Sequence, residues 1–156
     1  MKKTLDVVIP VLNEARALAD SVNVLAAFLS NNLNDYEWAV VVADNGSTDA
    51  TPSICQSLSE QDSRVKHVRL EQRGRGRALK RAWAESNADV VAYMDVDLST
   101  DLSVLPQTIA AVDGEGYDIA VGSRLKRGAQ VIGRSFKREL ISRSYSLIFR
   151  AMFLAG

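Results

Sequence analysis

The chain has 156 residues, no net charge at neutral pH, 47% hydrophobic residues and 24% charged residues, which are ordinary values for a globular domain with its own core. The single cysteine, Cys55, and the single histidine, His67, exclude a disulfide framework and a metal site built from several of either residue. The single histidine also argues against a Ser-His-Asp triad. The sequence contains no run of about 20 apolar residues, the length that a helix needs to cross a bilayer. Asp6 and Pro10 interrupt the segment where a signal peptide has its apolar core. We therefore expect neither a membrane span nor a secretion signal.

The charges are unevenly distributed along the chain. Residues 123–156 carry eight basic residues and one acid, Glu139, whereas the other 122 residues carry 11 basic and 18 acidic ones. An acidic body with a basic tail suggests two separate roles, although a charged stretch can also be a solvated helix face. Zero net charge and an acidic body argue against a nucleic-acid partner.

Short β-branched segments alternate with helical patterns along the first 122 residues. Strands are predicted over 5–11, 37–43, 65–70, 89–94 and 117–122. Helices are predicted over 13–30, from 49 or 51 onward, over 74–86 and over 102–112, with Pro52 in the first turn of the second helix. This alternation predicts an α/β structure with a mostly parallel sheet and right-handed crossovers.

Polar residues follow every predicted strand. They are Asn13 and Glu14 after the first, 44–49 after the second, 72–76 after the third, Asp95 and Asp97 after the fourth, and Ser123 and Arg124 after the fifth. Ligands of open α/β sheets bind beyond the carboxyl ends of the strands. We therefore expect these five segments to form one site.

The most informative segment is 89–99, where an apolar strand ends in Asp95 and Asp97. Carboxylates at the end of a buried strand are costly unless a positive group lies beside them. A Mg²⁺ or Mn²⁺ ion that also binds phosphate oxygens fits this requirement, because both ions prefer oxygen ligands. The alternative is a purely structural turn, in which Asp97 or Ser99 caps the next helix.

The tail from 134 to 154 predicts a basic amphipathic helix. Apolar residues recur on one helical face, and basic residues flank that face. Such a helix can lie in a membrane interface. It can equally pack on its own domain or on residues beyond Gly156, and amphipathicity alone does not separate these alternatives.

Five segments, in order, resemble the motifs of the inverting family 2 glycosyltransferases with the GT-A fold. They are 8–14, 42–49, 74–78, 93–99 and 121–124. The resemblance is greatest to the polyprenyl-phosphate branch, the dolichol-phosphate mannose synthases and dolichyl-phosphate glucosyltransferases. It implies an α/β, Rossmann-like, mostly parallel sheet flanked by helices. The implied domains are a nucleotide-sugar-binding domain over 1–133 and an amphipathic helix over 134–156 that looks truncated.

The resemblance also implies the residues of the site. Those expected to contact the nucleotide-sugar are Pro10, Leu12, Glu14, Asp44, Asp95, Val96, Asp97 and Arg124. Mg²⁺ or Mn²⁺ would be held by Asp95 and Asp97, with help from Ser99. Asp95, Asp97 and Arg124 are the expected catalytic residues, with the Arg124 guanidinium offsetting charge on the leaving phosphate.

Several of these residues also have a plain structural interpretation. Glu14 could complement a helix N-terminus, and Asp44 could form a turn. Arg124 could be a surface arginine paired with Asp118 or with a residue of the tail. Asp49 is expected to cap a helix rather than bind a ligand. The nearby arginines of the glycine-rich segment, Arg73, Arg75 and Arg77, are expected to be solvated.

The activity implied by the resemblance is transfer of a hexose, with inversion, from a UDP- or GDP-linked donor to a polyprenyl or dolichyl phosphate. The expected location is cytoplasmic, at the cytoplasmic face of a membrane that residues 134–154 contact, and the chain could form a homo-oligomer. Two alternatives stay open. One is an aspartate-nucleophile phosphatase in which Asp95 attacks phosphorus. The other is a non-catalytic nucleotide-binding fragment, suggested by a chain that stops within an apolar run.

Overall fold

The structure, a computed structural model, describes residues 1–123 and 136–153. It divides into two compact units, Met1–Ala120 and Val121–Gly156. The first unit holds a four-stranded sheet of order β3-β2-β1-β4. Its strands are β1 (Lys3–Val11), β2 (Tyr36–Asp44), β3 (Val65–Arg69) and β4 (Val90–Tyr93), and every pairing is parallel. The predicted α/β class with a mostly parallel sheet is confirmed.

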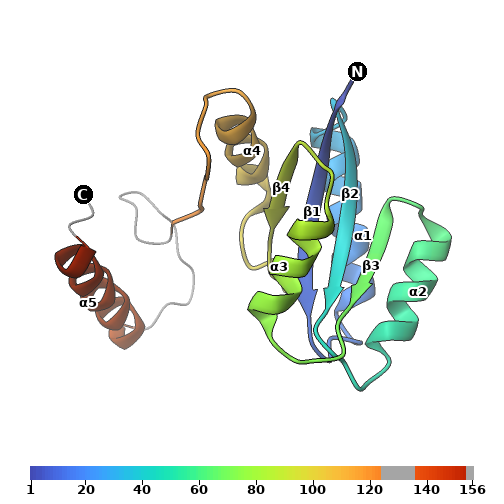
Figure 1. The fold of residues 1–156 in the computed structure, drawn as a ribbon, viewed down its shortest axis with the longest axis horizontal. Coiled ribbons are helices and arrows are strands. Elements are labelled where there is room, and N and C mark those ends of the chain that lie inside the picture. The colour runs from blue at the N-terminus through green and yellow to red at the C-terminus, as the bar shows by residue number, and fades with distance from the viewer. Residues whose placement is uncertain (124–135, 154–156) are drawn as a thin grey trace. The chain divides into compact units, whose positions relative to one another are not determined.

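Helices cover both faces of this sheet. They are α1 (Leu18–Asn32), α2 (Thr51–Gln61), α3 (Arg75–Glu85) and α4 (Leu105–Asp113), with a 3₁₀ turn, η1 (Leu102–Val104), directly before α4. Helices α1, α2 and α4 contribute to the larger hydrophobic core, whereas α3 packs on the opposite face of the sheet. Figure 1 shows α3 in front of the strands and α1 behind them.

The strands are buried because helices lie on both sides of them, which is the usual environment of a parallel sheet. In β1, Val7 and Ile9 face the core with α1, while Val8 faces α3. The predicted stripe of α1 is buried on that core, through Leu18, Val22, Leu25 and Leu29. On the other face, the buried contacts of α3 are two small residues, Ala78 and Ala82, so this helix can approach the strands closely.

Helix α1 begins at Leu18 and not at Asn13 as predicted. Asn13 has a left-handed backbone conformation, with φ of 56°, which a helix cannot contain. The carbonyl of Glu14 accepts the amides of Ala17 and Leu18 at 3.1 and 3.0 Å, so the chain makes one turn before the helix starts. The polar loop after β1 is therefore longer than the sequence pattern indicates.

The predicted fifth strand over 117–122 is wrong. This segment pairs with no strand among the described residues, and Ile119 and Val121 are 77% and 80% exposed. The amide of Tyr117 donates instead to the carbonyl of Ala111, and Gly116 turns the chain with φ of 77°. A β-branched pattern forms a strand only where a neighbouring strand offers hydrogen bonds and burial, and this segment receives neither.

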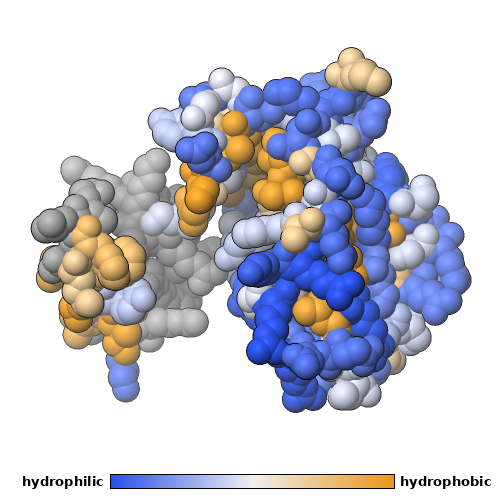
Figure 2. Space-filling view, in the orientation of Figure 1, coloured by the Kyte–Doolittle hydropathy of each residue, from blue (hydrophilic) through white to orange (hydrophobic). Residues whose placement is uncertain are grey.

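The second unit contains helix α5 (Phe136–Phe153), which agrees with the helix predicted over 134–154. Figure 2 shows apolar side chains gathered along α5. Among the described residues, no helix combines the length and the apolar character needed to cross a membrane. The predicted domain boundary at 133 falls outside the described residues and stays a prediction.

Candidate functional site

The carboxyl ends of the four strands meet at one edge of the sheet. Strand β1 ends at Val11 and β2 at Asp44, and these two residues are partners in the sheet, as are Asp44 and Arg69. The loops after β1, β2, β3 and β4 therefore leave the sheet on the same side, at the lower end of the strands in Figure 1. Four of the five polar segments expected at a common site are brought together in this way.

The two aspartates after β4 are exposed, and the apolar residue before each of them is buried. Met94 and Val96 are each 8% exposed and belong to the larger core, while Asp95 and Asp97 lie between and after them and are exposed. Successive side chains of an extended chain point to opposite sides. Burial of Met94 therefore directs the Asp95 carboxylate to the other, solvent-facing side, whereas Asp97 is exposed in the turn that follows the strand.

A tight turn then fixes the second aspartate. The amide of Leu98 donates to the carbonyl of Asp95 at 3.1 Å, and Leu98 has a φ of 46°. A left-handed leucine is unfavourable by roughly 1–2 kcal/mol, and its packing against the larger core offsets this. The Asp97 Oδ1 atom accepts the amide of Ser99 at 3.0 Å.

Each carboxylate retains an oxygen that makes no hydrogen bond with the described residues. Asp95 Oδ1 accepts a hydrogen bond from Arg75 Nη2, and Asp97 Oδ1 accepts the Ser99 amide, while Asp95 Oδ2 and Asp97 Oδ2 have no donor within the described ranges. This oxygen-only set suits a hard divalent cation. The described residues contain no cluster of three or more His, Cys, Asp or Glu that could hold a metal, so a cation here would need further oxygens from a ligand.

The structural alternative for Asp97 is only partly correct. Asp97 does close a local turn, but it does not cap the following helix. That role belongs to Asp101, whose Oδ1 accepts the amide of Ser103 at 2.9 Å at the start of η1. An aspartate directly before a helix is a recognisable capping signal in the sequence. The prediction nevertheless assigned the cap to Asp97 or Ser99 and not to Asp101.

The loop after β2 holds the loop after β1 in place. The amide of Asn13 donates to Ser47 Oγ at 2.9 Å, and Asn13 Oδ1 accepts the amide of Thr48 at 2.8 Å. The amide of Glu14 donates to Thr51 Oγ1 at 2.9 Å. These contacts explain why Asn13 is left-handed, and they make the 44–51 loop a brace for the site.

Asp49 also connects the β2 loop to the loop after β1. Its Oδ1 accepts the amide of Thr51 at 2.9 Å at the start of α2, and its Oδ2 accepts the amide of Ala15 at 3.2 Å. The hydrogen bonds from Thr51 are the main cause that holds the pKa of Asp49 below its ordinary value, and the hydrogen bond from the Ala15 amide acts in the same direction. Asp49 is thus a helix-capping residue, as predicted, although Ala50 occupies the N-cap position itself.

The side chain of Asp44 is completely buried at the end of β2. Its Oδ1 accepts the amide of Ser47 at 2.9 Å, so the predicted turn-forming role is real. Its Oδ2 has no hydrogen-bond partner, and it lies 3.8 Å from His67 Nε2 and 4.0 Å from Arg69 Nη1. Burial is the main cause that lowers the pKa of His67, and the Asp44 carboxylate opposes it.

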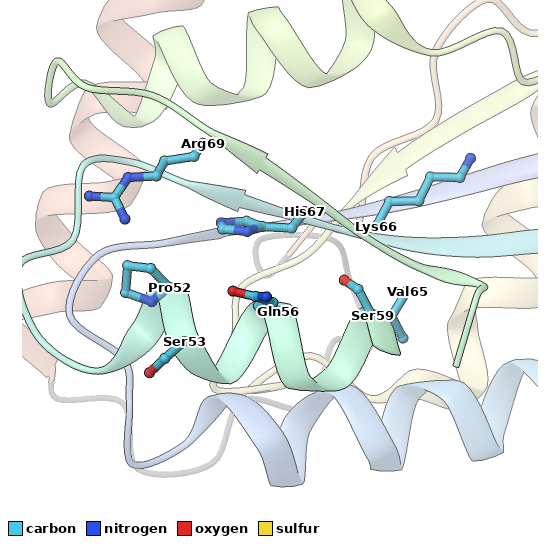
Figure 3. Close-up of a pocket in the computed structure, with 8 residues that line it drawn as sticks. All are labelled: Pro52, Ser53, Gln56, Ser59, Val65, Lys66, His67 and Arg69. Carbon is cyan, nitrogen blue, oxygen red and sulfur yellow. The ribbon is translucent and has the colours of Figure 1, made fainter. Parts of the chain in front are cut away.

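His67 and Arg69 were not predicted as site residues. They lie two positions apart on β3, and both line a cavity of about 610 Å³ between α2 and β3 (Figure 3). The full lining is Pro52, Ser53, Gln56, Ser59, Val65, Lys66, His67 and Arg69. No predicted site residue lines this cavity. The pairing of Arg69 with Asp44 in the sheet depends on register, which the separate strand patterns do not reveal.

The glycine-rich segment begins α3, as predicted. Gly74 is the N-cap residue with φ of 154°, and its amide donates to Oδ1 of Asn45, a buried side chain in the β2 loop. A glycine is also needed at position 46, because a Cβ there would lie 3.2 Å from the carbonyl oxygen of Glu71. Both contacts join the β2 loop to the chain that enters α3.

Most of the predicted site residues lie near one another in the fold. Those at the carboxyl edge of the sheet are Pro10, Leu12, Glu14, Asp44, Asp95, Val96, Asp97 and Ser99. The side chain of Val96 is buried, so it could meet a ligand only through its backbone. The carbonyl of Glu14 accepts the amide of Leu18, the first residue of α1, so the helix-terminus alternative for the Glu14 side chain stays open. Arg124 lies outside the described residues.

Comparison with known proteins gives a consistent result. Residues 6–153 match the family "Glycosyl transferase family 2". Glycosyltransferase AglD of Haloferax volcanii is 37% identical over 145 residues, and a dolichol-phosphate mannosyltransferase of Pyrococcus furiosus is 33% identical over 144 residues. Each alignment covers 92% of this chain but only 23% and 40% of the respective relative. The chain therefore spans less than half the length of these relatives.

Solved structures support the fold. A mannosyltransferase from Pyrobaculum calidifontis, in complex with GDP-Man and Mn²⁺, aligns over 70% of this chain and 32% of its own with a TM-score of 0.55 and 24% identity. The glucosyl-3-phosphoglycerate synthase of Mycobacterium tuberculosis, in complex with Mn²⁺, UDP and glucosyl-3-phosphoglycerate, aligns over 70% of this chain and 39% of its own, with a TM-score of 0.53 and 25% identity. Both neighbours were solved with a nucleotide and a divalent metal.

Proposed function

Since the chain belongs to glycosyl transferase family 2, we propose that it is the donor-binding domain of a metal-dependent inverting glycosyltransferase. The donor is a UDP- or GDP-linked hexose, and the acceptor is a polyprenyl or dolichyl phosphate. The observation that carries the proposal is the exposed pair Asp95 and Asp97 at the carboxyl edge of the sheet, each with an oxygen that no described residue binds.

The chemistry of the two carboxylates fits a divalent ion shared with the donor. Asp95 and Asp97 would hold Mg²⁺ or Mn²⁺ together with oxygens of the donor diphosphate, with Ser99 close by on the same turn. A divalent ion bound there would offset the negative charge that builds up on the departing diphosphate. The structural neighbours, solved with Mn²⁺ and nucleotide, support this assignment.

The loops around the pair would bind the rest of the donor. Pro10 lies near the end of β1, and Leu12 and Glu14 lie in the loop that follows it. Ser47 of the β2 loop accepts the amide of Asn13, and Thr51, the first residue of α2, accepts the amide of Glu14. The buried Oδ2 of Asp44 is an acceptor without a donor, and a ribose hydroxyl or base N–H could supply one after a local rearrangement. Arg124 is proposed to bind the departing phosphate.

A lipid phosphate acceptor suits this site because its anionic oxygen is itself the nucleophile, so no strong side-chain base is needed. The acceptor oxygen attacks the anomeric carbon, and the bond from that carbon to the diphosphate breaks with its electron pair leaving on the diphosphate. The anomeric configuration is inverted. The name of the P. furiosus relative, a dolichol-phosphate mannosyltransferase, supports this acceptor class.

We further propose that the basic tail contacts the cytoplasmic face of the membrane that carries this acceptor. In α5, Lys137 and Arg143 are exposed together with Leu140, Ile141 and Ile148. Exposed apolar and basic side chains on one helix suit an anionic bilayer surface. Co-sedimentation with vesicles containing phosphatidylserine should fall for K137E/R143E relative to the wild type. Equal binding of both proteins to the vesicles that contain phosphatidylserine would contradict an electrostatic contact, whereas neutral vesicles should not distinguish the two proteins.

A transfer assay tests the proposed activity. Radiolabelled UDP- or GDP-hexose is incubated with the chain, Mn²⁺ and vesicles that contain dolichyl phosphate, and the lipid is extracted. We expect labelled lipid with the wild type and none with D97N. A phosphoryl group trapped on Asp95 would favour the phosphatase alternative. Metal-dependent nucleotide binding without any transfer would favour a non-catalytic fragment.

A further inference from the structure

Arg75 and Asp95 form an ion pair that joins the start of α3 to the loop after β4. Arg75 Nη2 donates to Asp95 Oδ1, and the two side chains are 56% and 50% exposed. The residues are 20 positions apart in the sequence. A cation therefore already lies on one of the two carboxylates to which the proposed function assigns a metal.

The backbone of Arg75 is fixed, whereas its side chain reaches into solvent. Gly74, the residue before it, is held by Asn45, and the carbonyl of Gly74 accepts the amides of Arg77 and Ala78 at 2.8 and 3.0 Å. Burial of Ala78 against the sheet anchors the first turn of α3. The long arginine side chain can consequently change partners without movement of the helix.

We propose that Arg75 acts as an exchangeable counter-ion that couples metal binding to diphosphate binding. In the absence of the nucleotide-sugar, its guanidinium pairs with Asp95 and weakens the binding of a divalent cation to the same carboxylate. When a diphosphate arrives, the guanidinium moves to a phosphate oxygen, for which its planar array of donors is equally suited. The metal and the diphosphate then bind much better together than separately.

The charges at the site give the direction of the effect. Asp95 and Asp97 carry two negative charges and Arg75 one positive, so a divalent cation alone leaves the cluster with a net positive charge. The diphosphate of a nucleotide-sugar adds two negative charges, and that of free GDP or UDP adds about three at neutral pH, which the metal and Arg75 share. A unit charge and a divalent ion about 5 Å apart at a solvent-exposed site repel each other enough to change the metal affinity roughly tenfold.

This inference rests on the proposed function and is tested by metal binding, not by activity. Free Mn²⁺ is measured by electron paramagnetic resonance while MnCl₂ is added to the full chain of 156 residues, with and without GDP or UDP. We expect R75Q to bind Mn²⁺ alone about tenfold more tightly than the wild type. R75K, which keeps the charge, should remain close to the wild type. The gain in Mn²⁺ affinity caused by the diphosphate should fall about tenfold in R75Q.

The matched control is R77Q. Arg77 lies two residues further along the same turn, is exposed, and donates to Gln72 Oε1 at 2.9 Å rather than to either aspartate. We expect R77Q to behave like the wild type in both titrations. Equal Mn²⁺ affinity in the wild type and R75Q, or the same change in R77Q, would overturn the role of Arg75 while leaving the proposed function intact. A wild-type protein whose diphosphate binding ignores Mn²⁺ would overturn both.

Discussion

The Asn45 side chain accepts the backbone amide of Gly74, and this one hydrogen bond fastens the loop after β2 to the start of α3. Asn45 is only 6% exposed. The same loop binds the β1 loop through Ser47 and Thr51. A single short segment therefore sets the positions of its neighbours on both sides, and through Gly74 it sets the position of Arg75.

Replacement of Asn45 by alanine should destabilise the fold. The variant leaves the amide of Gly74 without its acceptor near a buried loop, and an unpaired polar group of this kind costs roughly 1–3 kcal/mol of unfolding free energy. Urea denaturation measures the change. The control is N32A, because the Asn32 side chain donates to the carbonyl of Phe28 at an exposed position. N32A should cost less than about 0.5 kcal/mol, and an equal loss in both variants would contradict the bracing role of Asn45.

The thiol of Cys55 should be inert in the folded protein. Cys55 is fully buried in α2, and burial, reinforced by the charge of Asp44, raises the pKa of its thiol to about 12. Thiolate is the reactive form, so little of it exists near pH 8. Ellman's reagent should label no thiol in the native protein and one equivalent in 6 M guanidinium chloride. Rapid labelling of the native protein at pH 8 would show that α2 opens readily.

Protonation of His67 should destabilise the fold. Burial lowers the folded-state pKa of this imidazole, with Asp44 acting in the opposite direction and Arg69 in the same direction as burial. Below a pH of about 6.5 the unfolded chain therefore binds a proton that the folded protein resists. This contribution to stability is complete above that pH and is lost as the pH falls through the folded-state pKa.

Two measurements check the His67 prediction. Because His67 is the sole histidine of the chain, its imidazole proton signal in a nuclear magnetic resonance titration needs no assignment and should report a pKa below 6.5. In addition, the urea midpoint of the wild type should decrease between pH 7.5 and pH 5 more than that of H67Q. An imidazole that titrates above 6.5 would contradict the prediction.

Much of the fold could be predicted from the sequence because local pattern and tertiary burial agree. The apolar run 38–43 becomes a fully enclosed strand, and the stripe that begins at Leu18 becomes the buried face of α1. The errors occur where distant contacts decide. Asn13 is drawn into the β2 loop and delays α1, and the segment 117–122 has strand-forming residues but no partner strand among the described residues.

The position of the two aspartates after β4 could be predicted in part, and their role in binding stays a prediction. The alternation of buried Met94 with exposed Asp95 follows from a strand pattern, whereas Asp97 is exposed by the turn after β4. The contacts between elements were not predictable. Arg75 was expected to be solvated but pairs with Asp95, and Asp44 and Arg69 become neighbours only through the register of β2 with β3.

Calorimetric titration of UDP and of GDP, with and without Mn²⁺, tests the central claim most directly. Asp97 and Asp101 form a matched pair, because the Oδ1 of each accepts the amide two residues further along the chain. We expect Mn²⁺ to strengthen binding of one diphosphate to the wild type and to D101N, and this gain to fall at least about tenfold in D97N. Binding that is the same with and without Mn²⁺, or a gain that D97N retains in full, would contradict a metal-bound donor at Asp95 and Asp97.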